Sequence, residues 1–175
     1  MKFTIKRGCK SADNILKMRL VSGRRLAFRF KLDASCLYNT EGIINGWNRV
    51  FGVSVLGTTG SCDLIFTKDH EELTLAMQVT YNTVSGNFQT SILKRLVGVC
   101  PGVWHQCEII HYKNPSGNWF YNLVIEGENN FSFPISWQMN APSGGIPVMR
   151  LRHPRLGGRY ILNDDLQIEI ETIKL

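Results

Sequence analysis

The sequence predicts an all-β fold, an antiparallel β-sandwich built from two sheets. Roughly ten to thirteen short segments alternate apolar and polar residues, and clusters of Gly, Pro, Asn and Ser separate them. Residues 103–128 hold two such segments around one breaker cluster, which is the pattern of a long hairpin. No stretch of about ten residues or more has a clear helical period, so strands are expected to carry nearly all of the fold.

The hairpin within residues 103–128 is the centre of this prediction. Residues 104–112 and 119–125 alternate with period 2, and residues 113–118 between them supply Asn, Pro, Ser and Gly for a turn. An apolar face of this length needs a second sheet to cover it, so most other segments should be strands packed against it. We expect Trp104 and Tyr112 to point into the sandwich, and Asn118 and Trp119 to form an accessible tip.

The remaining strands are predicted from the same alternation. In residues 25–32 apolar side chains alternate with cations, as on a strand with one wet face, and in residues 166–173 they alternate with Gln and Glu. Gly52 lies inside a predicted strand, which indicates a β-bulge or a close backbone approach. The other predicted strands span residues 3–5, 15–21, 49–56, 62–67, 73–81, 88–99, 131–137 and 148–151.

The length of 175 residues fits one domain that spans residues 1–175. The five cysteines form no CxxC pair and the four histidines lack metal-ligand spacing. The sequence therefore predicts free thiols, a reducing compartment, no metal site and no cofactor. Because the first residues contain no continuous apolar segment and no run is long enough to cross a bilayer, we expect no signal peptide and no membrane span.

The net charge of +6 is unevenly distributed, and half of the basic residues lie within residues 2–31. The alternating strand in this region favours a basic face that contacts solvent or a protein partner. We do not expect nucleic acid as a partner, because the chain lacks a helix-turn-helix, an RNP signature and a zinc finger. The predicted basic face comprises Arg24, Arg25, Arg29 and Lys31, and a second basic cluster comprises Arg150, Arg152, Arg155 and Arg159.

Three arrangements could carry catalysis, and each is incomplete. Glu126 and Glu128 lie on one face of a predicted strand, about 7 Å apart, but a third acid is missing. Gly158-Arg-Tyr160 resembles the Gly-x-Tyr motif of sandwich alginate lyases, whose Tyr donates a proton, but their Gln-x-His and Arg-x-x-x-Arg motifs are absent. Ser35 lies outside any nucleophile elbow. The sequence therefore predicts no catalytic residue, with a polysaccharide lyase or glycoside hydrolase as the alternative.

A glycan-binding surface is easier to support chemically. Aromatic rings stack on the C–H face of a sugar ring, and planar polar groups bind its hydroxyls. The candidate residues are Trp47, Trp119, Tyr121 and Tyr160 for stacking, and Asn118 and Arg159 for hydrogen bonds. We expect the acidic pair Asp164 and Asp165 to cap the turn before the last strand rather than to bind Ca²⁺.

Two resemblances to known families are visible. Residues 28–38, 47–54 and 154–158 read FRFKLDASCLY, WNRVFGVS and PRLGG. Together they resemble a largely uncharacterised family of small concanavalin A-like jelly-roll proteins, common in gut bacteria and their phages, which implies a jelly-roll sandwich. Residues 131–134 (FSFP) and 160–165 (YILNDD) resemble the end of a TRAF-type domain, another antiparallel sandwich.

The resemblances and the incomplete catalytic motifs lead us to expect a non-enzymatic module. It would be a structural or decorating component of a phage virion or a similar assembly, and it could display a glycan-binding surface. Its partners would be capsid or other virion proteins, further copies of the chain, or a glycan, and its location the virion or the cytoplasm of the producing cell. The sequence leaves open a free lectin-like carbohydrate-binding protein and a TRAF-like peptide-binding domain.

Overall fold

Two antiparallel sheets form a jelly-roll sandwich, which confirms the predicted fold class. The computed structural model describes residues 1–9, 12, 20–37, 46–57, 60–69, 72–82, 88–127, 135–140, 147–156 and 164–173. Most of these residues lie in strands, and the helical element among them is the 3-10 turn η1 (Ala34–Leu37). No helix within the described ranges is long and apolar enough to cross a membrane.

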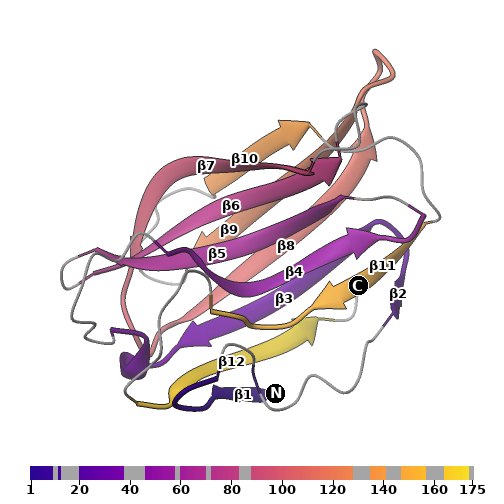
Figure 1. The fold of residues 1–175 in the computed structure, drawn as a ribbon. Coiled ribbons are helices and arrows are strands. Elements are labelled where there is room, and N and C mark those ends of the chain that lie inside the picture. Colours follow the sequence, from indigo (N-terminus) through magenta and orange to yellow (C-terminus); the bar gives the residue numbers. More distant parts are fainter. Residues whose placement is uncertain are drawn as a thin grey trace.

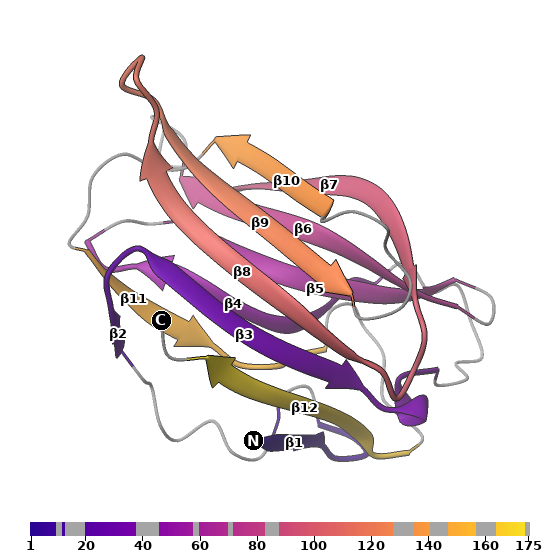
Figure 2. The same cartoon turned by 180° about the vertical axis from the view of Figure 1, so that it is seen from behind.

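The two sheets stack face to face, as Figure 1 and the reverse view in Figure 2 show. In spatial order, sheet A holds β1 (Lys2–Ile5), β12 (Leu166–Ile173), β3 (Arg25–Leu32), β8 (Trp104–Lys113), β9 (Trp119–Gly127) and β10 (Ile135–Asn140). Sheet B holds β2 (Leu20–Ser22), β11 (Val148–Arg152), β4 (Asn48–Val55), β5 (Ser61–Asp69), β6 (Glu72–Asn82) and β7 (Phe88–Val99). The hairpin β8–β9 therefore lies inside sheet A, covered by sheet B as expected.

The hydrophobic core lies between the sheets, because alternate side chains of each strand point inward. Phe28 and Phe30 of β3 are fully buried, as are Phe51 of β4 and Phe66 of β5. The rings of Phe28 and Phe51 meet edge to face across the two sheets, with centroids 5.1 Å apart. The predicted wet faces of β3 and β12 are confirmed, since their charged residues alternate with buried apolar ones.

The inward face of β8 differs from the prediction. Its buried residues are His105, Cys107, Ile109 and His111, so Trp104 and Tyr112 face outward, and the expectation that these two point inward is wrong. Apolar residues occur at both odd and even positions of this strand, so alternation alone did not decide which set faces the core. The outward indole of Trp104 is covered by cations, with Arg29 Cζ 4.9 Å and Lys31 Nζ 5.1 Å from the ring centroid.

The β8–β9 hairpin projects beyond the sandwich (Figure 1) and ends in an ordered turn. The amide of Asn118 donates to the side-chain oxygen of Asn114 at 2.9 Å, and the amide of Gly117 donates to the Asn114 carbonyl at 2.9 Å. Gly117 has a φ of 89°, which a residue with a side chain rarely adopts. The breaker cluster predicted here therefore forms a pre-organised tip.

Two predicted strands differ in their bounds. The segment expected at 15–21 is represented by β2 (Leu20–Ser22), and residues 13–19 lie outside the described ranges. The segment expected at 131–137 is represented by β10 (Ile135–Asn140), and residues 131–134 also lie outside them. Strand ends are set by pairing with neighbours rather than by local sequence, which is why their existence was easier to predict than their limits.

The cysteines are free thiols, as predicted. Cys36, Cys62 and Cys107 are buried, and burial raises the pKa of each thiol, whereas Cys9 and Cys100 are exposed. Because the thiolate is the reactive form, we expect a thiol-reactive chromophore to label two thiols in the native protein and all five after denaturation. Rapid labelling of a third thiol in the native protein would contradict the buried positions.

Candidate functional site

The outward face of sheet B carries two polar rows that cross several strands. In the first row Arg150, Ser54, Ser61, Thr80 and Thr90 are successive cross-strand partners from β11 to β7. In the second row the successive partners are Arg152, Gly52, Asp63 and Gln78. Neighbouring strands lie about 4.8 Å apart, so each row presents hydroxyl, amide and guanidinium groups at short, regular intervals.

Asp63 is the anchor of the second row. Its side chain is 4% exposed, and its Oδ2 accepts from Arg152 Nη1 at 2.8 Å and lies 3.7 Å from Arg49 Nη1. Arg152 also contacts the hydroxyl of Ser61, and Arg49 donates its Nε to the carbonyl of His153 at 2.8 Å. Both guanidiniums are thereby held at fixed positions, and we call Arg49, Asp63 and Arg152 the arginine cluster.

A bulge and a glycine bring the arginine cluster together. The pairing of β4 with β5 shifts register between Arg49 and Phe51, and Gly52 lies directly opposite Asp63. A Cβ on Gly52 would overlap Asp63 Oδ1 and would lie 2.6 Å from the carbonyl oxygen of Cys62. The predicted close approach at Gly52 is therefore confirmed, and the bulge lies just before it, between Arg49 and Phe51. The missing side chain of Gly52 leaves room for the Asp63 carboxylate.

The electrostatics of the arginine cluster are those of a buried carboxylate between two cations. Burial raises the pKa of Asp63, and Arg152 and Arg49 oppose that rise. Burial also lowers the pKa of Arg49, while the attraction of Asp63 opposes the decrease. Asp63 Oδ1 is buried and has no hydrogen-bond partner in the described part of the chain. With two arginines for one aspartate, the cluster keeps an excess positive charge that can bind a planar anion such as a carboxylate.

The raised pKa of Asp63 predicts how stability responds to acid. A carboxyl group with a higher pKa in the folded than in the unfolded chain binds its proton more readily when folded, so it adds stability as the pH falls towards the unfolded value of about 3.9. We therefore expect the wild type to gain stability relative to Asp63→Asn between pH 7 and pH 4, measured as the difference in unfolding free energy. If the unfolding free energy of the wild type instead decreased relative to that of Asp63→Asn as the pH falls, the arginines would lower the pKa of Asp63 overall.

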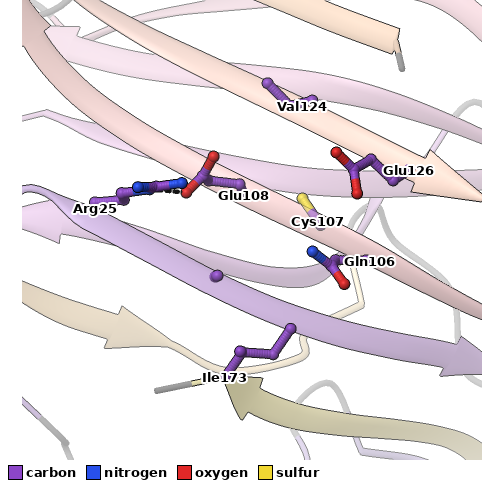
Figure 3. Close-up of a pocket in the computed structure, with 8 residues that line it drawn as sticks. Arg25, Gln106, Cys107, Glu108, Val124, Glu126 and Ile173 are labelled. Atoms are coloured by element: carbon purple, nitrogen blue, oxygen red, sulfur yellow. Dashed lines mark hydrogen bonds and ion pairs between the residues drawn. The ribbon is translucent and has the colours of Figure 1, made fainter. Parts of the chain in front are cut away.

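A second candidate lies on the outward face of sheet A, where a hollow of about 120 Å³ opens above the small side chain of Ala27. Figure 3 shows Arg25 beside Glu108, with Gln106 and Glu126 around the opening. Arg25 and Glu108 form an ion pair, while Glu126 is exposed. Glu128, which the sequence pairs with Glu126, lies outside the described residues. The carboxylates give this hollow a negative rim that suits cations rather than anionic ligands.

The residues of the predicted basic face are mostly paired with acids. Arg29 Nη2 lies 2.6 Å from Glu171 Oε2, and Lys31 Nζ lies 2.7 Å from Glu169 Oε1. Together with the Arg25–Glu108 pair, these contacts form a ladder of ion pairs across β12, β3 and β8. Arg24 lies apart from this ladder, at the end of the sandwich, where its guanidinium contacts the ring of Trp119. A protein partner for these four residues remains a prediction.

The predicted glycan-binding residues do not form one surface. Trp47 is partly exposed, Asn118 is exposed at the hairpin tip, and Trp119 is partly exposed beside it. Tyr121 faces the core and is fully buried, so its ring is inaccessible to a ligand. Arg159 and Tyr160 lie within residues 157–163, outside the described ranges. Of the acidic pair, Asp165 accepts the amide of Arg7 at 2.9 Å, a contact with the residues that follow β1, and capping of the turn before β12 stays a prediction.

Sequence reasoning missed the arginine cluster, although its residues were visible. In the sequence Arg152 lies among other C-terminal arginines, Arg49 lies within a predicted strand, and no motif surrounds Asp63. An aspartate between Cys62 and Leu64 in an apolar run is a signal of a buried charge that needs a partner. The identity of that partner depended on which strands pair, because Arg152 and Asp63 lie far apart along the chain, on β11 and β5.

Comparison with known proteins places the fold. No protein-family model matches the chain, and no curated protein matches it. Among solved structures, a mutant of the alginate lyase Aly36B in complex with an alginate trisaccharide aligns over 99% of this chain and 81% of its own, with a TM-score of 0.60 and 10% identity. The marine PL-14 alginate lyase from Aplysia kurodai aligns over 98% of this chain and 80% of its own, with a TM-score of 0.57 and 10% identity. The chain thus has a sandwich fold that these alginate lyases share.

These matches correct the expected function. The expectation of a non-enzymatic module that decorates a virion, with its lectin-like and peptide-binding alternatives, is overturned because the similar solved structures are polysaccharide lyases. The error has a physical cause. Strand periodicity predicts the sandwich, but the side chains on its outward faces decide what the protein does, and local motifs did not reveal which of them meet.

Proposed function

We propose that the protein is a polysaccharide lyase that acts on an acidic, uronate-containing polysaccharide bound across the outward face of sheet B. The observation that carries the proposal is the arginine cluster, in which a buried Asp63 holds two partly exposed guanidiniums on that face. The side chains of Arg49 and Arg152 are 16% and 30% exposed, so both can contact a ligand while remaining anchored. The fold shared with two alginate lyases supports the same reading.

The chemistry of a uronate lyase explains why fixed arginines matter. In β-elimination a base removes the proton at C5 of a uronic acid, and the electron pair of that bond forms the C4–C5 double bond. The glycosidic bond at C4 breaks, and the leaving oxygen takes up a proton. Because the C5 proton is adjacent to the carboxylate, its removal places negative charge on that group. Arg49 and Arg152 would bind the carboxylate and stabilise this charge with little rearrangement.

The neighbouring polar residues suit the sugar hydroxyls. Ser54 and Thr80 offer hydroxyl groups and Gln78 an amide, all partly exposed and all on the same two rows as the arginines. Such groups donate and accept hydrogen bonds as sugar hydroxyls require. The overall charge of +6 would favour the approach of a polyanion, and this attraction would weaken as salt is added.

The proton donor in this proposal is Tyr160. Its Gly158-Arg-Tyr160 segment resembles the motif that supplies a proton-donating tyrosine in sandwich alginate lyases. Tyr160 lies outside the described residues. In the sequence it comes shortly after Arg155, whose backbone carbonyl accepts the amide of Arg49 at 2.8 Å and whose amide donates to the carbonyl of Arg49 at 3.1 Å. We therefore expect Tyr160→Phe to retain binding of the polymer and to lose most of its cleavage.

The proposal is tested by incubating the protein with alginate, polyglucuronate and polygalacturonate, and with a neutral β-glucan as control. The expected result is the ultraviolet absorbance of an unsaturated uronate with at least one of the acidic polymers and none with the glucan. Absence of product from every acidic polymer, or new reducing ends without that absorbance, would overturn the proposal. The second result would indicate hydrolysis instead of elimination.

A further inference from the structure

Trp119 is held in place by two groups beside the tip of the β8–β9 hairpin. The ring of His111 stacks on the indole at 17°, with centroids 4.7 Å apart, and Arg24 Cζ lies 4.5 Å from the indole centroid. Arg24 Nη1 and His111 Nδ1 are 2.7 Å apart. Because a guanidinium only donates hydrogen bonds, His111 Nδ1 accepts this bond, and the ring proton of the neutral imidazole is therefore on Nε2.

These distances place Arg24 and His111 on the same face of the indole. Each contact of this kind takes about 3.5 Å perpendicular to the ring, so groups on opposite faces would be about 7 Å apart. Their nitrogens are separated by only 2.7 Å, which excludes that arrangement. The other face of Trp119 has no ring or cation stacked on it among the described residues. The indole is therefore held from one side, and Trp119 as a whole is partly exposed.

Trp119 lies at the end of the sandwich nearest the first polar row. The turn between β2 and β3 links the two sheets there. On the side of sheet B the amide of Gly23 donates to the carbonyl of Pro147 at 2.6 Å, and on the side of sheet A the amide of His111 donates to the carbonyl of Arg24 at 2.8 Å. Pro147 immediately precedes β11, whose Arg150 belongs to that row. A polymer that follows the strands from the arginine cluster towards Arg150 would leave sheet B at this end.

We propose that the partly exposed indole of Trp119, held by Arg24 and His111, is a remote binding subsite that stacks a uronate ring of the polysaccharide. The proposal rests on the proposed function for the identity of the ligand. Lys113, the cross-strand partner of Trp119, is exposed and supplies a cation for the sugar carboxylate. Asn118 is exposed at the adjacent position and supplies an amide for the hydroxyls. The ordered hairpin turn keeps these groups in place before the ligand binds, which lowers the entropic cost of binding.

The test compares variants by affinity electrophoresis in gels that contain an acidic polymer, and by the rate of product formation. Trp119→Ala is expected to weaken binding of the long polymer about tenfold, because one stacking contact is lost, and Trp119→Phe should restore most of it. Cleavage of a short oligosaccharide that fills only the arginine cluster should stay within a factor of about two of the wild type. Arg24→Ala should weaken polymer binding less than Trp119→Ala, because it loosens the indole without removing it.

Trp104→Ala is the matched control, since Trp104 is also partly exposed and contacted by two cations but lies on the outward face of sheet A. Equal loss of binding in Trp104→Ala and Trp119→Ala, or unchanged binding in Trp119→Ala, would overturn the subsite. A wild type that binds the polymer through Trp119 without forming unsaturated product would sustain the subsite and overturn the lyase. Indole N–H signals in NMR spectra provide a second readout, and only that of Trp119 should shift when the polymer is added.

Discussion

Arg152→Ala is expected to lower the turnover of a uronate polymer by about 100-fold, the usual effect of removing one fixed donor from a site of developing charge. Arg152 makes the shorter of the two contacts to Asp63, at 2.8 Å, and it lies on β11, the strand next to the edge strand β2 of sheet B. The loss should appear in kcat and in kcat/KM, because the interaction strengthens as charge develops on the substrate carboxylate. Initial rates of unsaturated product formation measure it.

The control for this variant is Arg29→Ala. Arg29 also forms an ion pair with an acid, Glu171, but it lies on the outward face of sheet A and is more exposed, at 49% against 30% for Arg152. We expect its turnover to remain close to that of the wild type. Arg152→Lys should recover only part of the activity, because a lysine cannot form the bidentate contact. Equal losses in Arg152→Ala and Arg29→Ala would place the anion site elsewhere.

Gly52→Ala is expected to destabilise the fold by about 3 kcal/mol, at the upper end of the range for overpacking. The added Cβ would overlap Asp63 Oδ1 and lie 2.6 Å from the carbonyl oxygen of Cys62 and 2.9 Å from Asp63 Cα. Two of these three neighbours are backbone atoms in the centre of a sheet, which have no room to move. For a chain of this size the change corresponds to a decrease in Tm of roughly 6–12 °C, measured by thermal unfolding.

Gly98→Ala provides the matched control for Gly52→Ala. Its new Cβ would lie 3.2 Å from Glu72 Oε2, the mobile end of an exposed side chain that can rotate away. We expect a change in Tm of no more than a few degrees. If the Tm of Gly52→Ala equalled that of Gly98→Ala, β4 would not pack closely on Asp63, and the proposed anchoring of the two arginines would be contradicted.

The fold was predictable because apolar and polar residues alternate locally along most of the strands. In strands such as β3 and β12 the charged residues lie on the face opposite the core, so the pattern of apolar and charged residues specified both the strand and its wet face. In β8 the pattern was ambiguous, since apolar residues occupy both parities. His105 and His111 face the core there, and Trp104 and Tyr112 face outward, which reverses the expectation.

The candidate site was much less predictable, because it depends on which strands become neighbours. Arg152 reaches Asp63 only because β11 pairs with β4 and β4 with β5, an order that the sequence does not encode locally. The same holds for Trp119, whose contacts come from Arg24 in the turn before β3 and His111 on the partner strand. Residues far apart in the chain form both sites, so no local motif describes either of them.

The most direct test of the proposed site is to map where an acidic oligosaccharide binds, by following backbone amide signals in NMR spectra as a uronate tetrasaccharide is added. We expect the largest shifts at Arg49, Gly52, Asp63 and Arg152, on strands β4, β5 and β11, and we expect Arg152→Ala to abolish them. Shifts confined to β3, β8 and β12 of sheet A, with no change around Asp63, would contradict it.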